Sequence, residues 1–128
     1  MNRVVLDTNV FLRILLNDIP EQVKQAERIL QQGKTGRRIL IVPQAVIFEI
    51  AFALEKIYYF PKENIIDRLS SILSSGYFQI QDSDIFKDTI EIYKQKNLSL
   101  VDCFLYAFSL KNKAELFTFD KNLQKFKE

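Results

Sequence analysis

Short apolar segments alternate along this chain with longer segments of helical periodicity, and this alternation constrains the fold more than any other feature. Four strands are predicted, at residues 3–6, 39–42, 77–80 and 116–119. Helices are predicted at residues 8–17, 20–32, 44–59, 62–75, 82–97 and 99–113, with a last helical turn from residue 120. Strands separated by helices usually pair in parallel, with helices on both faces of the sheet. We therefore expect an α/β fold, a three-layer α/β/α sandwich around a mostly parallel sheet of four to five strands.

Glycine and proline mark the predicted boundaries of the helices. Pro20 suits the first turn of the helix at residues 20–32, and Pro61 is expected to end the helix at residues 44–59. Gly33 and Gly76 are each expected to end a helix. No linker, repeat or low-complexity tract interrupts the pattern, and 128 residues is an ordinary size for one domain. We expect residues 1–128 to form a single domain.

Composition excludes several kinds of chemistry. The chain has no histidine, which removes Ser-His-Asp and Cys-His catalysis, imidazole acid–base chemistry and His-ligated zinc sites. The net charge of +2 neither indicates nor forbids nucleic-acid binding. Cys103 is the single cysteine and is expected to be a small core residue. Without a disulfide, a signal-like N-terminus or a long apolar run, we expect a cytoplasmic protein that does not enter a membrane.

Four acidic residues occur where an apolar environment is expected. Asp7 lies where the first predicted strand ends and a helix begins, and Asp120 follows the last strand. If both strands are parallel, these two residues lie at the same edge of the sheet. Glu49 interrupts the apolar helix 44–59, and Asp102 lies among apolar residues of helix 99–113.

Clustered carboxylates in an apolar environment repel one another unless a cation compensates their charge. Mg²⁺ and Mn²⁺ prefer such oxygen ligands and can activate water against a phosphodiester. Structural explanations remain open for each residue. Asp7 and Asp120 could be helix N-caps, Asp102 could complete a capping box with Ser99, and Glu49 could pair with Arg3 or Arg13.

At these positions the chain resembles the PIN-domain nucleases, and in length and layout the VapC-type toxins of toxin–antitoxin pairs. The resemblance covers residues 4–123 and predicts a PIN-like sandwich. Its four motifs contain, in order, Asp7 with the supporting Asn9, then Glu49, then Asp102, and finally Asp120 with Thr118. Two positions depart from the usual pattern. Cys103 replaces a small residue, and Asn122 stands where some relatives have another acid, which puts a second metal in doubt.

The resemblance implies an endoribonuclease that depends on Mg²⁺ or Mn²⁺ and leaves a 5′-phosphate and a 3′-hydroxyl. In this interpretation Asp7, Glu49 and Asp102 hold the main ion and Asp120 assists. The family also implies inhibition by a small antitoxin protein, and homodimerisation. From the sequence itself, Arg13 and Lys121 are candidate contacts to the RNA backbone. A place at the apolar rim is the alternative for Arg13, and a solvated C-terminal face is the alternative for Lys121.

Other functions remain open at this stage. The same nuclease chemistry would serve housekeeping RNA processing, and a gene for a small antitoxin beside this one would favour the toxin. A catalytically silent interaction module is disfavoured because all four acidic positions are filled. A phosphatase-like site would need Asp-x-Asp, and position 9 is asparagine.

Overall fold

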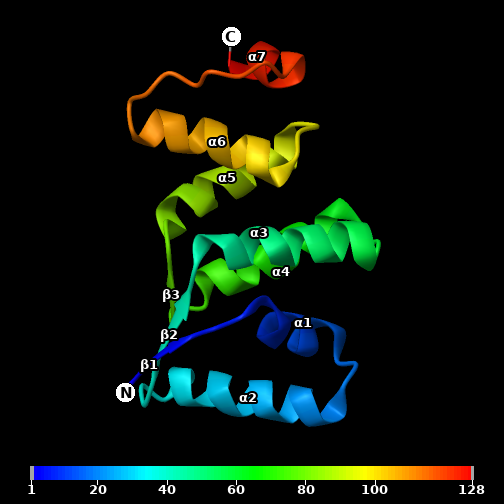
Figure 1. Ribbon diagram of the computed structural model, residues 1–128, viewed down its shortest axis with the longest axis vertical. Coiled ribbons are helices and arrows are strands. Elements are labelled where there is room, and N and C mark those ends of the chain that lie inside the picture. The colour runs from blue at the N-terminus through cyan, green and yellow to red at the C-terminus, as the bar shows by residue number, and fades with distance from the viewer. Residues whose placement is uncertain (1, 128) are drawn as a thin grey trace. The chain divides into compact units, whose positions relative to one another are not determined.

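The computed structural model describes residues 2–127, in a first unit that ends at Gln81 and a second that begins at Asp82. The first unit contains three parallel strands, β1 (Arg3–Val5), β2 (Ile39–Val42) and β3 (Phe78–Ile80), in the order β1-β2-β3 (Figure 1). Leu40 of β2 is in register with Val4 on one side and Phe78 on the other. The first three predicted strands, and their parallel pairing, are confirmed.

Helices connect the strands of the first unit. α1 (Thr8–Leu16) and α2 (Pro20–Lys34) join β1 to β2, whereas α3 (Gln44–Phe52), the π-helix η1 (Ala53–Ile57) and α4 (Lys62–Ser74) join β2 to β3 (Figure 1). The core of the unit forms where these helices pack on the sheet. Side chains of β2 point alternately into this core and away from it. Leu40 and Val42 are fully buried, whereas Ile39 is 44% exposed. The alternation of strands and helices confirms the α/β class.

Gly33 does not end a helix, contrary to the prediction. It lies inside α2, which continues to Lys34, and it is buried against β2. A Cβ atom at this position would overlap the side chain of Leu40. Gly33 therefore permits close approach of the helix to the sheet. The turn that follows α2 contains Gly36, whose φ is +79°. Gly76, with φ +82°, follows α4 as predicted.

The predicted helix 44–59 changes its winding halfway. After Phe52 the helix becomes π-helical, and the N–H of Tyr58 donates to the carbonyl of Ala53 at 3.0 Å. Tyr59 then takes a positive φ of 56°, and Pro61 opens α4. The apolar periodicity predicted the helix but carried no sign of the wider turn.

The second unit consists of α5 (Ser83–Gln95), α6 (Leu100–Lys111) and α7 (Lys121–Lys127). α5 packs on α6 through Phe86 and Phe104, whose ring centroids are 4.8 Å apart. Cys103 is completely buried, as predicted. The ring of Tyr106 on α6 lies 4.5 Å from that of Phe126 on α7. None of the helices that the structure describes is long and apolar enough to cross a membrane.

The prediction of a strand at residues 116–119 is wrong, and the sheet of residues 2–127 has three strands, fewer than the four to five expected. Residues 114–120 have no regular secondary structure, and Phe117 and Phe119 are 77% and 87% exposed. An apolar run becomes a strand only when a neighbouring strand pairs with its backbone. Local sequence shows the apolar run but not the pairing.

Candidate active site

Asp7 is separated from β1 by Leu6 alone and is the N-cap of α1. Its backbone is extended, with φ −85° and ψ 158°, and its Oδ1 accepts a hydrogen bond from the backbone N–H of Asn9 at 3.1 Å. The N-cap explanation of Asp7 is therefore correct, but it accounts for one carboxylate oxygen only. Among residues 2–127, Oδ2 accepts no hydrogen bond and is available for another ligand.

Glu49 lies in α3 and is linked to the start of α1. The hydroxyl of Thr8 donates to Glu49 Oε1 at 2.7 Å, across 41 residues of sequence. Thr8 is the first residue of α1 and follows Asp7 directly. This hydrogen bond joins the two acidic motifs of the first unit at the carboxyl end of β1, which is where sites lie in parallel sheets.

The N-terminus of α3 is fixed by a residue from the end of β3. Pro43, the N-cap of α3, provides no capping side chain. Instead, Gln81 Oε1 accepts a hydrogen bond from the N–H of Gln44 at 2.9 Å, and the N–H of Gln81 donates to the carbonyl of Val42 at 3.1 Å. The carboxyl ends of β2 and β3 thus jointly position the helix that carries Glu49.

Asp102 lies in the first turn of α6, in the second unit. Ser99 is the N-cap of this helix, and its hydroxyl oxygen accepts a hydrogen bond from the N–H of Asp102 at 3.1 Å. This is one of the two hydrogen bonds of a capping box, and it leaves the carboxylate of Asp102 uninvolved.

Asp120 and Thr118 form a compact turn before α7. The N–H of Asp120 donates to Thr118 Oγ1 at 3.1 Å, and Asp120 Oδ1 accepts from the N–H of Leu123 at 3.0 Å. Asp120 therefore caps α7 as Asp7 caps α1. The hydroxyl of Thr118 thus binds the backbone of Asp120 in this turn.

Comparison with known proteins decides the family. The sequence matches the PIN domain over residues 4–128. The chain belongs to the PIN domain family. It is also 27% identical over 99 residues to a VapC ribonuclease of Aquifex aeolicus (strain VF5), an alignment that covers 77% of this chain and 73% of that protein. Both findings agree with the predicted PIN-like α/β fold and support the predicted nuclease class.

The acidic residues of this PIN domain are more exposed than the sequence predicted. Asp7, Glu49 and Asp120 are exposed, and Asp102 is half-buried. Helix N-termini and turns, where three of them occur, leave a carboxylate accessible to solvent. The cost of burying charge therefore does not by itself require a cation here. Among residues 2–127, no three His, Cys, Asp or Glu side chains lie together as a complete metal site.

The predicted ion pair of Glu49 with Arg3 or Arg13 is not formed. Within the described part of the PIN domain, Glu49 has the hydroxyl of Thr8 as its side-chain partner. Arg13 Nε lies 3.1 Å from Asp18 Oδ1, and the arginine side chain is only 13% exposed. The carboxylate of Glu49 is thus not neutralised by a basic residue and keeps its second oxygen available.

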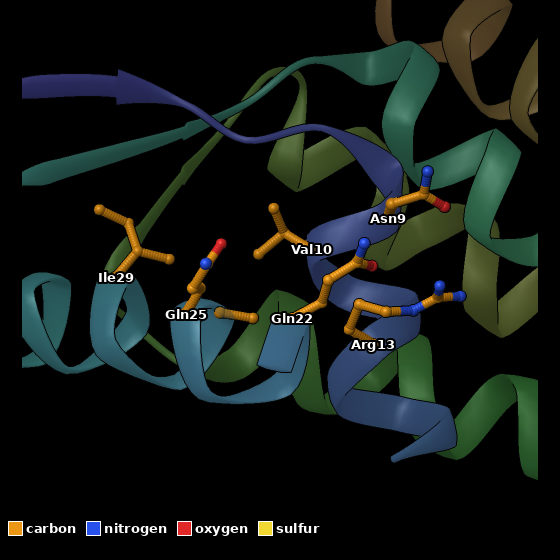
Figure 2. Close-up of a pocket in the computed structure, with 7 residues that line it drawn as sticks. Asn9, Val10, Arg13, Gln22, Gln25 and Ile29 are labelled. Carbon is orange, nitrogen blue, oxygen red and sulfur yellow. The ribbon is translucent and has the colours of Figure 1, made fainter. Parts of the chain in front are cut away.

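Asn9 and Arg13 line a shallow pocket between α1 and α2, with a volume of about 340 Å³ (Figure 2). Gln22 and Gln25 from α2 also line it, with Val10, Ala26 and Ile29 as apolar lining. The pocket therefore combines amide groups with apolar carbon on one face of the first unit. Asn9 contributes its backbone N–H to Asp7 and its side chain to this pocket.

Two residues of the site escaped the sequence analysis. Thr8 lies between Asp7 and Asn9 at the start of a predicted helix. Threonine is common at helix starts, so its presence there did not indicate a role in the site. Gln81 lies in a polar turn with no periodic signal. Both act through contacts with residues distant in sequence, for which a single sequence offers no pattern.

Proposed function

We propose that this PIN domain is an endoribonuclease that depends on Mg²⁺ or Mn²⁺ and acts as the toxin of a toxin–antitoxin pair. The observation that carries the proposal is the hydrogen bond to Glu49 from Thr8, which follows Asp7 directly at the carboxyl end of a parallel strand, in a chain of the PIN family. The likeness to a VapC ribonuclease favours the toxin over housekeeping RNA processing.

The donor set fits a hard divalent cation. Asp7 and Glu49 each use one oxygen in a hydrogen bond and keep the other, and neither forms an ion pair within residues 2–127. We propose that these two residues hold the ion together with Asp102, and that Asp120 assists. A cation held there supplies a nucleophilic water and neutralises charge on the phosphodiester.

Other residues of the chain have proposed supporting and RNA-binding roles. The backbone N–H of Asn9 binds the carboxylate of Asp7, and the hydroxyl of Thr118 binds the backbone N–H of Asp120. Lys121 is exposed beside Asp120 and is proposed to contact an RNA phosphate. Arg13 is mostly buried and paired with Asp18, so its proposed contact to RNA is the weaker of the two. RNA as the substrate, a small antitoxin as partner, a homodimer and a cytoplasmic location complete the proposal.

The test uses purified chain, freed of any bound partner, and labelled structured RNA with Mn²⁺, Mg²⁺ or EDTA. Asp7→Asn is the informative variant, because asparagine caps a helix as well as aspartate does and folding is preserved. Asp67→Asn, at an exposed position of α4, is the matched control. We expect EDTA and Asp7→Asn to abolish cleavage and the control to cut normally.

A second readout does not require cleavage. Excess Mn²⁺ should raise the melting temperature of the wild type and of Asp67→Asn, because an ion that binds only the folded state stabilises it. The melting temperature of Asp7→Asn should rise much less in excess Mn²⁺. If no RNA is cut and Mn²⁺ shifts no melting temperature, the proposal is wrong and an interaction module becomes the better explanation.

The toxin role has its own test. Induced expression of the wild type in a bacterial host should arrest growth, whereas Asp7→Asn should not. Normal growth of cells that contain active, soluble wild-type enzyme would favour RNA processing instead.

A further inference from the structure

We propose that Thr8 is a positioning residue whose hydroxyl holds the carboxylate of Glu49 beside Asp7 and so sets the affinity of the site for its cation. This inference rests on the proposed nuclease function. It begins with the hydrogen bond of 2.7 Å from Thr8 Oγ1 to Glu49 Oε1. Thr8 is half-buried, whereas Glu49 is exposed.

The donor of this bond has a fixed position. Thr8 is the first residue of α1, and Asp7 fixes this helix start through its bond to the N–H of Asn9. The carbonyl of Asp7 also accepts from the N–H of Val10 at 3.1 Å. A β-branched side chain has few rotamers, so the hydroxyl of Thr8 is restricted once its backbone is set.

The acceptor would be mobile without this bond. Glutamate has three side-chain torsions, and Glu49 has no ion pair among residues 2–127 to restrict them. The Thr8 hydroxyl selects the rotamers that direct the carboxylate toward the end of β1. Because it engages Oε1 only, Oε2 stays available to a cation. The carboxylates of Asp7 and Glu49 are thereby organised before the ion arrives.

A pair of substitutions separates the hydroxyl from the shape of the side chain. Thr8→Val keeps the volume and the β-branch but removes the donor. Thr8→Ser keeps the donor. The matched control is Thr35→Val, because Thr35 is an exposed threonine of the same unit whose hydroxyl bonds to Gln31 at the end of α2.

Mn²⁺ affinity of the purified chain, measured by calorimetry, is the main readout, with melting temperature alongside. Loss of a residue that orients a metal ligand typically weakens affinity about 10- to 100-fold, and we expect a loss in this range for Thr8→Val. Thr8→Ser should bind nearly as tightly as the wild type, and Thr35→Val should bind normally. Melting temperatures without Mn²⁺ should differ little between the two Thr8 variants.

A second background tests whether Thr8 acts through Glu49. In Glu49→Ala, adding Thr8→Val should cause no further loss of Mn²⁺ affinity, because the carboxylate that Thr8 orients is already gone. A full additional loss would show that Thr8 acts elsewhere and would overturn the inference.

The remaining outcomes are distinct. Equal Mn²⁺ binding by Thr8→Val and the wild type would overturn the role of Thr8 and leave the nuclease proposal intact. Equal loss in the valine and serine variants, with lowered melting temperatures, would show a structural role and also overturn it. A wild type that binds no Mn²⁺ and cuts no RNA would overturn both proposals.

Discussion

The side chain of Gln81 caps a helix that begins 37 residues earlier in the sequence, because its Oε1 accepts a hydrogen bond from the N–H of Gln44 at 2.9 Å. A helix N-terminus has backbone N–H groups without partners inside the helix, and Pro43 offers none here. The first turn of α3 therefore depends on the end of β3. Glu49 lies on the same helix, so this contact also supports the candidate active site.

Replacing Gln81 by alanine should destabilise the first unit. The N–H of Gln44 would lose its acceptor, and loss of a helix cap costs about 1 kcal/mol. Urea unfolding would measure this as a lower midpoint with an unchanged slope. Gln81→Glu is the matched variant, because its carboxylate keeps an acceptor and places negative charge at a helix N-terminus. If alanine and glutamate variants are equally unstable, the cap is not the source of the loss.

Gly33→Ala should also be destabilising, although alanine is the better helix former. The helix propensity gained is about 1 kcal/mol, whereas forcing a methyl group into a packed core costs about 1–3 kcal/mol. The new Cβ would overlap Cδ1 and Cγ of Leu40, which is completely buried. We expect a net loss of stability in urea unfolding.

Leu40→Val provides the check on this explanation, since it shortens the side chain that the Cβ would meet. The double variant should be more stable than the sum of the two single effects predicts. Strict additivity would mean that the loss in Gly33→Ala does not arise from contact with Leu40.

Some features of the fold and of the site were predictable from the sequence, and others were not. The apolar runs predicted β1, β2 and β3, because short apolar segments between helical ones leave a local pattern. Asp7 was singled out because it is an acidic residue at the junction of an apolar strand and a helix. Thr8 and Gln81 were missed since their partners lie 41 and 37 residues away. Gly33 was misread because a glycine that ends a helix and one that permits close packing look alike.

The ion pair of Asp84 and Lys111 should make a small, pH-dependent contribution to stability. Lys111 Nζ lies 2.8 Å from Asp84 Oδ2, and this hydrogen bond lowers the pKa of Asp84 and raises the pKa of Lys111. A lowered carboxyl pKa stabilises the fold above the unfolded value, and the contribution is lost as pH falls through the folded value. The raised pKa of Lys111 acts at the alkaline end, where stability is lost as pH rises through it.

Lys111→Met should therefore be slightly less stable than the wild type at neutral pH, and the difference should vanish well below the ordinary Asp pKa of 3.8. Both side chains are exposed, so the effect is small and should fall with added salt. Urea unfolding at neutral and acid pH measures it, with Lys87→Met, another exposed lysine, as control. A difference that persists in acid would point to lost packing of the lysine stem.

We propose that both units belong to one cooperative domain, and Cys103 provides the probe. Its thiol is completely buried in the second unit, so it should react with an aromatic disulfide reagent only when that unit opens. Helical circular dichroism reports both units together. In a urea titration, thiol reactivity and loss of helical signal should give coincident transitions, as a two-state domain requires. If the thiol reacts at clearly lower urea than that at which the helices melt, the second unit unfolds on its own, and the prediction of a single domain is wrong.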